Sequence, residues 1–352
     1  MDINELYIFY FSGTGNAKRV ALWLSLNCAK HHLPCHLFNI AKFRKEDINL
    51  LPPTATIVFI SPIHGFNYPP ITLDFINKFP KGNQKVILMN TRAGMKLGGW
   101  ITPGLTGIAF FISAYLLRRK GYQIIAQIPY DMPSNWLSLH PALNTNSVAF
   151  IHRNIFQKVT EHFNLLLSGK KMFLSKKDLI QDVLVAPISL LYYFIGRFIF
   201  SKTFYASHLC DGCNICIKEC PVQAIIEIEN RPFWTLKCES CMHCMNHCPQ
   251  NAIETSHALI AVTTILYFLV TAFLFYLTGS WLQSHFVLRI VFSNLVFMVL
   301  LVLLYKIQHL ILGIKPIAKM IALTSLTFYK WWGRYHSIPD KVWRSKIDNG
   351  PE

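Results

Sequence analysis

Two cysteine runs, CDGCNICIKECP at Cys210–Pro221 and CESCMHCMNHCP at Cys238–Pro249, carry the most specific signal in this chain of 352 residues. Both runs match C-x2-C-x2-C-x3-C-P, and each continues as P-x-x-A-I, so together they form an internal repeat. A [4Fe–4S] cube needs four thiolates around a compact body, and three closely spaced cysteines can reach three of its irons. In a repeated arrangement of this kind, the fourth cysteine of each run binds the other cluster.

This spacing predicts two [4Fe–4S] clusters with crossed ligand sets. The first set is Cys210, Cys213, Cys216 and Cys248, and the second set is Cys238, Cys241, Cys244 and Cys220. Zinc is the alternative metal, but zinc sites usually take two spaced cysteine pairs, which does not explain two four-cysteine runs that end in proline. His243 and His247 lie inside the second run, and we expect them to be surface groups or hydrogen-bond donors to sulfur.

About fifty residues around these runs resemble the bacterial two-[4Fe–4S] ferredoxins, and the resemblance implies one-electron transfer at low potential. Only Cys28 and Cys35 lie outside the runs. The N-terminus, MDINELYIFYF, has no basic region before its short apolar stretch, so we interpret it as a strand and not as a signal peptide. These features favour a reducing compartment for the thiols.

Upstream of the cysteines, residues 5–170 alternate between apolar strands and amphipathic helices. Such alternation predicts a parallel sheet that is covered by helices on both faces, which is an α/β doubly wound fold. The expected strands are 6–12, 35–41, 55–62, 85–91 and 122–130, and the expected helices are 16–33, 70–79, 107–121 and about 147–168. Five strands are compatible with a flavodoxin-like order, although periodicity alone does not determine strand order.

The stretch FYFSGTGNAKRVA (Phe9–Ala21) follows the first expected strand and opens the first expected helix. Hydroxyl groups and open backbone N–H groups at a helix N-terminus bind phosphate dianions. The stretch lacks the G-K-[ST] end of a Walker loop, and it resembles the phosphate loop of flavodoxins, S/T-x-T-G-N-T, with Ala17 where a hydroxyl is usual. The candidate FMN phosphate ligands are Ser12, Gly13, Thr14, Gly15, Asn16 and Ala17.

Two later loops, SPIHGFNYPP (Ser61–Pro70) and NTRAGMKLGGW (Asn90–Trp100), are expected at the carboxyl ends of strands, where open α/β sheets bind ligands. The flavodoxin resemblance implies that they wrap the flavin ring, with glycines allowing close approach and His64, Phe66, Tyr68 or Trp100 able to stack on it. The alternative is a flavodoxin-like fold that has lost its flavin. The candidate ring contacts are Pro62, His64, Gly65, Phe66, Thr91, Arg92, Ala93, Gly94 and Gly99.

The order of modules resembles a group of bacterial and archaeal flavodoxin–ferredoxin fusion proteins. FSGTGN, PIHGFNYPP, NTRAG and MPSNW (Met132–Trp136) carry this resemblance, which covers about residues 5–255. It implies a flavodoxin-like FMN domain at 1–170 and a small α+β two-[4Fe–4S] ferredoxin domain at 207–256. The implied cofactors are FMN and two [4Fe–4S] clusters.

After the cysteines come two uncharged or nearly uncharged apolar stretches, which predict a transmembrane helical hairpin at 257–306. Basic residues lie before the first stretch and after the second, so the positive-inside rule places the flavin and cluster domains on the cytoplasmic side of a multi-pass protein. A pair of buried core helices is the alternative. The segment 171–206 is expected to be a basic and apolar connector that packs on the domains or lies in the membrane interface, because Pro187 and Arg197 make it a poor third span. Residues 307–352 are expected to be a basic, aromatic interfacial tail.

These features predict a membrane-anchored electron relay between FMN and the clusters. The expected partners are membrane lipid and a redox partner protein or quinone. The net charge of +16 comes without a nucleic-acid-binding motif, so we expect no nucleic-acid partner. A redox-sensing protein without turnover is the alternative function, and an enzyme with an organic substrate at the flavin stays open. Haem binding by His257, His285 or His309 is disfavoured, because these histidines are not paired at suitable spacing.

Overall fold

A computed structural model describes residues 3–43, 51–140, 143–278 and 285–329. The chain divides into two compact units. Within the described residues, the first unit holds the N-terminal part through Phe194 together with Cys241–Asn246, and the second holds Ile195–Ser240 and the residues that follow from His247. Each domain boundary drawn from the sequence stays a prediction.

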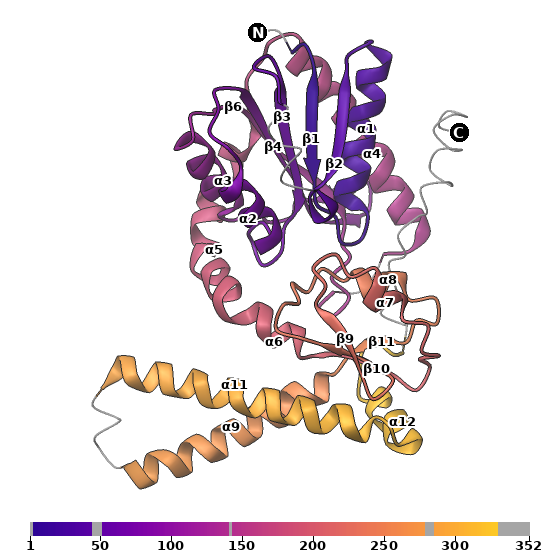
Figure 1. Ribbon diagram of the computed structural model, residues 1–352, viewed down its shortest axis with the longest axis vertical. Helices are drawn as coiled ribbons and strands as arrows, with labels where there is room; N and C mark the ends of the chain where they lie inside the picture. The colour runs from indigo at the N-terminus through magenta and orange to yellow at the C-terminus, as the bar shows by residue number, and fades with distance from the viewer. Residues whose placement is uncertain (1–2, 44–50, 141–142, 279–284, 330–352) are drawn as a thin grey trace. The chain divides into compact units, whose positions relative to one another are not determined.

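The first unit is built on a mainly parallel sheet in the order β2-β1-β3-β4-β6-β7 (Figure 1). Its neighbouring strands run parallel along this path. The bounds are β1 Leu6–Tyr10, β2 Cys35–Asn39, β3 Thr56–Pro62, β4 Lys85–Leu97, β6 Gln123–Pro133 and β7 Met172–Phe173. The first five strands follow the flavodoxin-like order 2-1-3-4-5, with β6 as the fifth. The predicted fold class is therefore confirmed, and β7 adds a short strand at the edge.

Helices cover both faces of this sheet, as the alternating pattern predicted (Figure 1). On one face, α1 (Asn16–Lys30) and α4 (Thr145–Leu167) share one apolar cluster with the sheet. On the other face, α2 (Pro70–Lys78) and α3 (Ala109–Arg118) share a second cluster with it. A short 3-10 helix, η1 (Ile40–Lys42), follows β2. The carboxyl ends of the strands are left free for the loops that carry the candidate flavin contacts.

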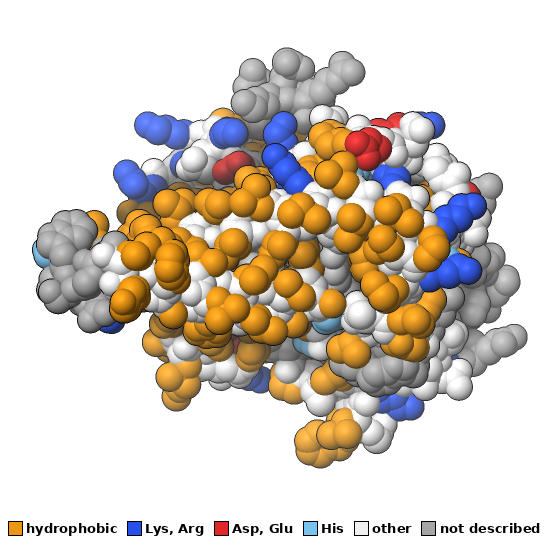
Figure 2. Space-filling view, turned by 90° about the horizontal axis from the view of Figure 1, so that it is seen from below, with side chains coloured by type: hydrophobic (Ala, Val, Ile, Leu, Met, Phe, Trp, Pro, Cys, Tyr) orange, Lys and Arg blue, Asp and Glu red, His pale blue; other side chains and the backbone are white. Residues whose placement is uncertain are grey.

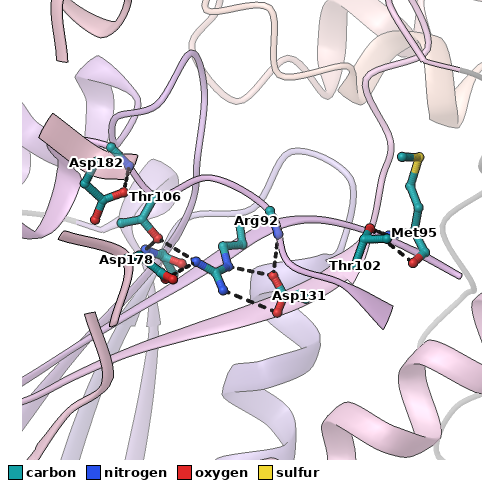
Figure 3. A network of polar contacts seen from close by, with 10 residues as sticks. Arg92, Met95, Thr102, Thr106, Asp131, Asp178 and Asp182 are labelled. Carbon is teal, nitrogen blue, oxygen red and sulfur yellow. Dashed lines mark hydrogen bonds and ion pairs between the residues drawn. The ribbon is translucent and has the colours of Figure 1, made fainter. Parts of the chain in front are cut away.

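The loop expected at Asn90–Trp100 is wrong, because β4 continues to Leu97 and pairs with the antiparallel strand β5 (Trp100–Thr102). Gly98 has φ +59, in the region that glycine adopts most readily, so the Gly98–Gly99 pair supplies a two-residue hairpin turn. The hydroxyl of Thr102 accepts the Met95 N–H at 3.1 Å and closes the hairpin (Figure 3).

The segment after β7 is helical through most of its length. It comprises the 3-10 helix η3 (Leu174–Asp178), α5 (Leu179–Leu191), a π-helical turn η4 (Tyr192–Gly196) and α6 (Arg197–Ser201). The helical span Leu174–Ser201 is long and apolar enough to cross a membrane by length and composition.

The second unit contains two small antiparallel sheets in its cysteine-rich part. One pairs β9 (Ile225–Ile228) with β10 (Arg231–Trp234), and the other pairs β8 (Phe204–Ala206) with β11 (Ile253–Thr255). The short helices α7 (Ile215–Lys218) and α8 (His243–His247) each lie within a cysteine run, and α8 extends from the first unit into the second.

Two long helices follow β11 in the second unit, α9 (His257–Thr278) and α11 (Phe286–Ile311), and then α12 (Lys315–Leu323). The helical spans His257–Leu277 and Phe286–Ile311 are long and apolar enough to cross a membrane. Hydrophobic side chains form a continuous band over this hairpin (Figure 2). The end of α11 differs from its beginning, because Tyr305, Gln308 and His309 are buried against the cysteine-rich part. Most of the predicted interfacial tail, residues 330–352, lies outside the described residues.

Candidate redox site

The predicted phosphate loop lies between β1 and α1, at the carboxyl edge of the sheet. Gly15 caps α1 with φ 98, and the Ser12 hydroxyl accepts the Gly15 N–H at 3.1 Å. No side chain caps the helix, and its first turn holds no acidic residue. The first N–H groups of a helix have no partner within it, so this end of α1 offers donors and the positive end of the helix dipole to an anion.

Two side-chain hydrogen bonds join this loop to the end of β6 and the residues after it. Asn135 donates to the Thr14 hydroxyl, and the Asn16 side chain donates to the Pro133 carbonyl at 2.9 Å. Pro133 and Asn135 belong to MPSNW, a motif for which the sequence alone indicates no role. The donor set therefore fits a phosphate, with Ser12, Gly13, Thr14, Gly15, Asn16 and Ala17 at one helix N-terminus.

The loop after β3 meets the end of α5. Gly65 has φ +54, and a Cβ added to it would overlap the ring of Tyr192. At Gly65, where we expect a flavin ring to approach the backbone closely, an aromatic ring of the chain itself makes this approach. Tyr68 is buried in the core, where its hydroxyl donates to the Met89 carbonyl at 2.9 Å, so its expected stacking role is wrong.

The remaining candidate ring contacts near this edge differ in exposure. Pro62, His64 and Phe66 are partly exposed in the loop after β3. On β4, Thr91 is buried, Ala93 is exposed, and Gly94 lies close to the backbone of Asp131 on β6. Gly99 lies in the hairpin turn, with open space around it. Contact between any of these residues and a flavin stays a prediction.

Arg92, another candidate flavin contact, is the centre of a buried polar network (Figure 3). Its Nε donates to Asp131 at 2.6 Å, and its Nη1 donates to Asp178 at 2.5 Å. Asp131 also accepts the Gly104 N–H at 2.8 Å. Arg92 thus joins β4, β6 and the segment that leads into α5, a structural role that its sequence position did not reveal.

The two cysteine runs have matching backbone conformations. At three pairs of equivalent positions both residues have positive φ, namely Gly212 and Ser240, Asn214 and Met242, and Gln223 and Asn251. In each run the backbone N–H of the repeated alanine donates to the sulfur of the fourth cysteine, four residues earlier. The internal repeat of the sequence is therefore a repeat of local structure.

Some thiols of the second unit lie near thiols of the other cysteine run, and the crossed ligand sets themselves stay a prediction. Burial, followed by the nearby Cys210 and Cys248 thiols, raises the pKa of Cys216 to about 12. Burial raises the pKa of Cys238 to about 12, and the nearby Cys220 thiol adds to this effect. Each fourth cysteine is thus a neighbour of cysteines from the other run.

Zinc is the alternative metal for these thiols. Among the residues that the structure describes, no three His, Cys, Asp or Glu side chains converge so as to hold a single metal ion. A zinc ion draws four ligands to one point, whereas a cube distributes its thiolates over four irons. The choice between the two metals therefore rests on the cysteine spacing. Cys241 and Cys244 belong to the first unit, so the complete second ligand set stays a prediction.

The helix of the second cysteine run contacts the phosphate loop within the first unit. His243 Nδ1 lies 2.6 Å from the Gly13 carbonyl oxygen, and because a carbonyl only accepts, the imidazole donates this bond. A Cβ added to Gly13 would lie 2.9 Å from Cys241 Cβ, so glycine is needed for this approach. The expectation that His243 is a surface group or a sulfur donor is therefore wrong for its Nδ1, which binds the backbone of the phosphate loop.

The histidines considered for haem take part in contacts within the second unit. His309 lies with Nε2 3.1 Å from the Ile228 carbonyl, and His257 Nδ1 accepts the Leu326 N–H at 3.3 Å. His309 thus joins α11 to the cysteine-rich part, and His257 joins the start of α9 to the segment after α12, which are structural roles.

Residues 209–253 match the 4Fe-4S dicluster domain family. The chain is a fusion of a flavodoxin-like domain and a 4Fe-4S dicluster ferredoxin domain. No curated protein matches this fusion protein. Its flavodoxin-like assignment comes from the strand order, and its ferredoxin assignment from the family match and the repeated cysteine geometry.

Solved structures also resemble the N-terminal part of the fusion protein. Flavodoxin 1 from Bacillus cereus is 13% identical over 45% of this chain and 98% of its own, with a TM-score of 0.30. General stress protein 14 from Treponema denticola, in complex with FMN, is 12% identical over 47% and 98%, with a TM-score of 0.32. Rubredoxin oxygen:oxidoreductase from Desulfovibrio gigas is 14% identical over 46% of this chain, with a TM-score of 0.27, and the match spans only 37% of that protein.

Proposed function

We propose that the fusion protein transfers electrons between an FMN held at the phosphate loop and two [4Fe–4S] clusters held by the cysteine runs. FMN supplies two-electron chemistry and the clusters supply one-electron steps, so joining them in one chain converts between the two. Electron transfer itself follows from the two domain types. The number of clusters, the flavin, the membrane anchor and the partner are parts of the proposal.

The observation that carries this proposal is the 2.6 Å contact between His243 Nδ1 and the Gly13 carbonyl. Gly13 belongs to the candidate phosphate loop, and His243 lies between two candidate cluster ligands, Cys241 and Cys244. The helix of the second cysteine run therefore meets the flavin end of the sheet in one compact unit. This supports electron exchange between the flavin and the cluster that takes Cys241 and Cys244.

The α9–α11 hairpin supports a membrane location for the relay. Both helices have an apolar length that suits a bilayer, and many of their side chains are exposed. Lys306, Lys315 and Lys319 follow the apolar part of α11, so the positive-inside rule favours a cytoplasmic ferredoxin domain. We propose a quinone or a membrane redox protein as the partner, with a soluble redox protein as the alternative.

Anaerobic purification of the full chain in detergent, followed by iron, zinc and flavin analysis, tests the cofactors. We expect about eight irons, as two cubes of four, and about one FMN per chain. Rapid mixing with a reduced quinone analogue should then lower the visible absorbance of the flavin and of the clusters, because both become reduced. Zinc in place of iron would contradict the relay, as would cluster signals that do not respond to flavin reduction.

A redox sensor is the second candidate, and one feature of the second unit favours it. The Tyr305 hydroxyl of α11 accepts the backbone N–H of Trp234 in β10 at 3.0 Å, which joins the hairpin directly to the ferredoxin domain. A change at the clusters could therefore be reported through the helices. Redox-dependent partner binding without turnover would favour the sensor, and sustained quinone turnover would favour the relay.

A further inference from the structure

Helix α5 has the reverse of the usual pattern for a helix on a soluble domain. Its buried positions are polar, since Asp182 and Ser189 are 1% and 0% exposed. Its outward positions are apolar, since Ile180, Leu184 and Leu191 are 80%, 73% and 59% exposed. A surface helix of a soluble protein normally turns its apolar stripe to the core and its polar face to water.

The polar face of α5 is bonded to the flavin-binding edge of the sheet. Asp182 Oδ1 accepts the Gly107 N–H at 2.7 Å, and the Ser189 hydroxyl donates to the Phe66 carbonyl at 3.0 Å. Asp178, the residue immediately before α5, pairs with Arg92 (Figure 3). These bonds hold the whole length of the helix against the first unit.

This attachment argues against α5 as a third membrane span, although the segment Leu174–Ser201 is long and apolar enough. A spanning helix would have to give up the bonds of Asp182 and Ser189, or carry the sheet into the hydrocarbon. Either change would leave polar groups without partners in lipid, which is strongly unfavourable.

We propose that α5 lies in the plane of the membrane interface, with its apolar face in lipid, and holds the flavin-binding edge of the first unit at the bilayer surface. This inference rests on the proposed membrane anchoring by α9 and α11. It adds a second, non-spanning contact that belongs to the flavodoxin-like domain.

The charges around α5 favour a lipid surface over a protein partner. Four exposed lysines precede the helix, at Lys170, Lys171, Lys176 and Lys177. From Leu179 to Ser201 the single acidic residue is Asp182, which is buried and already bonded. A basic flank beside an apolar face suits the anionic headgroups of the cytoplasmic leaflet.

The residue types on the outward face of α5 also favour a lipid surface over a protein partner. Its most exposed residues are aliphatic, whereas protein interfaces favour Tyr, Trp, Met and Arg. Pro187 is also exposed on this helix. The apolar face of such a helix is buried about 5–10 Å into the boundary between headgroups and acyl chains. The polar face of α5 needs no further partner there, because it is already bonded to the domain.

Photoreactive phospholipids test this placement on the full chain in lipid nanodiscs that contain anionic lipid. One probe carries a carbene precursor near the headgroup, and the other carries it at the end of the acyl chain. After illumination and proteolysis, mass spectrometry maps the lipid adducts. We expect α5 peptides to be labelled by the shallow probe and not by the deep one, and α9 and α11 peptides to be labelled by both.

Each other pattern has a defined meaning. Labelling of α9 and α11 without labelling of α5 overturns the inference and leaves the proposed hairpin anchor in place. Crosslinks between the α5 segments of two copies would also overturn the inference, because the apolar face would then be covered by protein. Deep labelling of α5 equal to that of α9 would show a third span. Absence of labelling on all three helices would overturn both this inference and the proposed anchor.

A paired variant tests the apolar face directly. Ile180→Gln with Leu184→Gln should abolish shallow labelling of α5 and leave labelling of α9 unchanged. Phe111→Gln, on an exposed apolar residue of α3, is the matched control and should leave all labelling unchanged. Amide hydrogen exchange at Gly107 reports whether the polar face is still docked in the paired variant, so loss of labelling with Gly107 still protected supports the inference.

Discussion

The backbone N–H of Ala252 donates to the sulfur of Cys248 at 3.3 Å, and Ala224 makes the same bond to Cys220 at 3.2 Å. Hydrogen bonds to cluster sulfurs help to set reduction potentials. Since both bonds fall on the fourth cysteine of a run, each stabilises the ligand that is predicted to cross to the other cluster. The repeat therefore prepares both crossed ligands in the same way.

Replacing one crossed ligand should remove one cluster. For Cys248→Ser we expect the cluster of Cys210, Cys213 and Cys216 to be lost, because its fourth thiolate is gone. Iron should fall from about eight to about four per chain. Iron analysis and the electron paramagnetic resonance spectrum of the reduced protein measure this change.

The reciprocal variant, Cys220→Ser, should remove the other cluster and leave a different resonance spectrum. Cys28→Ser is the control, because Cys28 lies in the core of the flavodoxin-like domain and outside both runs. If Cys248→Ser and Cys220→Ser leave identical spectra, the crossed assignment is wrong.

The contact between His243 and Gly13 should affect transfer between flavin and cluster. His243→Ala removes a hydrogen bond with a net contribution of about 1 kcal/mol. This corresponds to about a fivefold change in the equilibrium between α8 in contact with the phosphate loop and α8 detached from it. Cluster reduction after flavin photoreduction should slow by a similar factor, with iron and FMN content unchanged. Stopped-flow or flash absorbance gives the rate.

Gly13→Ala gives an independent test of the same contact, because the new methyl group would overlap the backbone of Cys241. The matched control is His36→Ala, which removes an exposed imidazole from β2. An unchanged rate in both His243→Ala and Gly13→Ala would mean that the contact has no part in transfer.

Asp182 should be important for docking of α5. Asp182→Ala leaves the buried Gly107 N–H without its acceptor, which costs about 1–3 kcal/mol, and Asp182→Asn costs less because the amide oxygen can accept. Hydrogen exchange at Gly107 and protease cleavage after residue 174 should increase in the order wild type, Asn, Ala. Glu161→Ala, on an exposed position of α4, should change neither. Equal protection in Asp182→Ala and wild type would remove this role.

The buried imidazole of His152 makes the flavodoxin-like domain sensitive to acid. Burial, and then the charge of Arg19, lower the pKa of His152 to about 2. In the unfolded chain the pKa is about 6.5, so below that value the unfolded state binds a proton that the folded state does not. Stability is therefore complete above about pH 6.5 and falls by up to about 1.4 kcal/mol per pH unit below it.

Thermal unfolding between pH 5 and pH 8, followed by tryptophan fluorescence, measures this effect. The variant His152→Gln carries no titrating group and should show a flatter acid limb. His162→Gln is a less suitable control because His162 is also partly buried, so His36→Gln on the surface is preferred. An equally steep limb in His152→Gln would assign the acid sensitivity to other groups.

Local signals in the sequence were sufficient for the parts of the fold that depend on neighbouring residues. The glycines and hydroxyls from Ser12 to Ala17 predicted the loop and the start of α1, and the cysteine spacing predicted the repeated loops. The flavodoxin resemblance places the Gly98–Gly99 pair in a flavin loop, although two glycines between extended residues are also a hairpin signal. The structure follows the local turn chemistry at this pair.

Contacts between distant residues were beyond the reach of the sequence. His243 and Gly13 are 230 residues apart, and neither has a local pattern that indicates the other. Asp178, Asp182 and Ser189 were visible at helical spacing, but their meaning depended on Gly107 and Phe66. Without knowledge of those backbone partners, polar residues in an apolar helix only argue against a membrane span. In the structure, these polar residues hold the helix to the domain.

No flexible linker separates β11 from the hairpin, since Thr255 ends the strand and α9 begins at His257. Ser256 between them is held as well, because its hydroxyl donates to Gln308 of α11 at 2.7 Å. A ferredoxin domain on a long tether would search for its partner by swinging through a volume of cytosol. Under the proposed membrane anchoring, this domain is held directly by its helices, so its encounters would depend on lateral diffusion in the bilayer and on rotation about the membrane normal. A partner would then have to present its own redox centre at a matching height above the lipid.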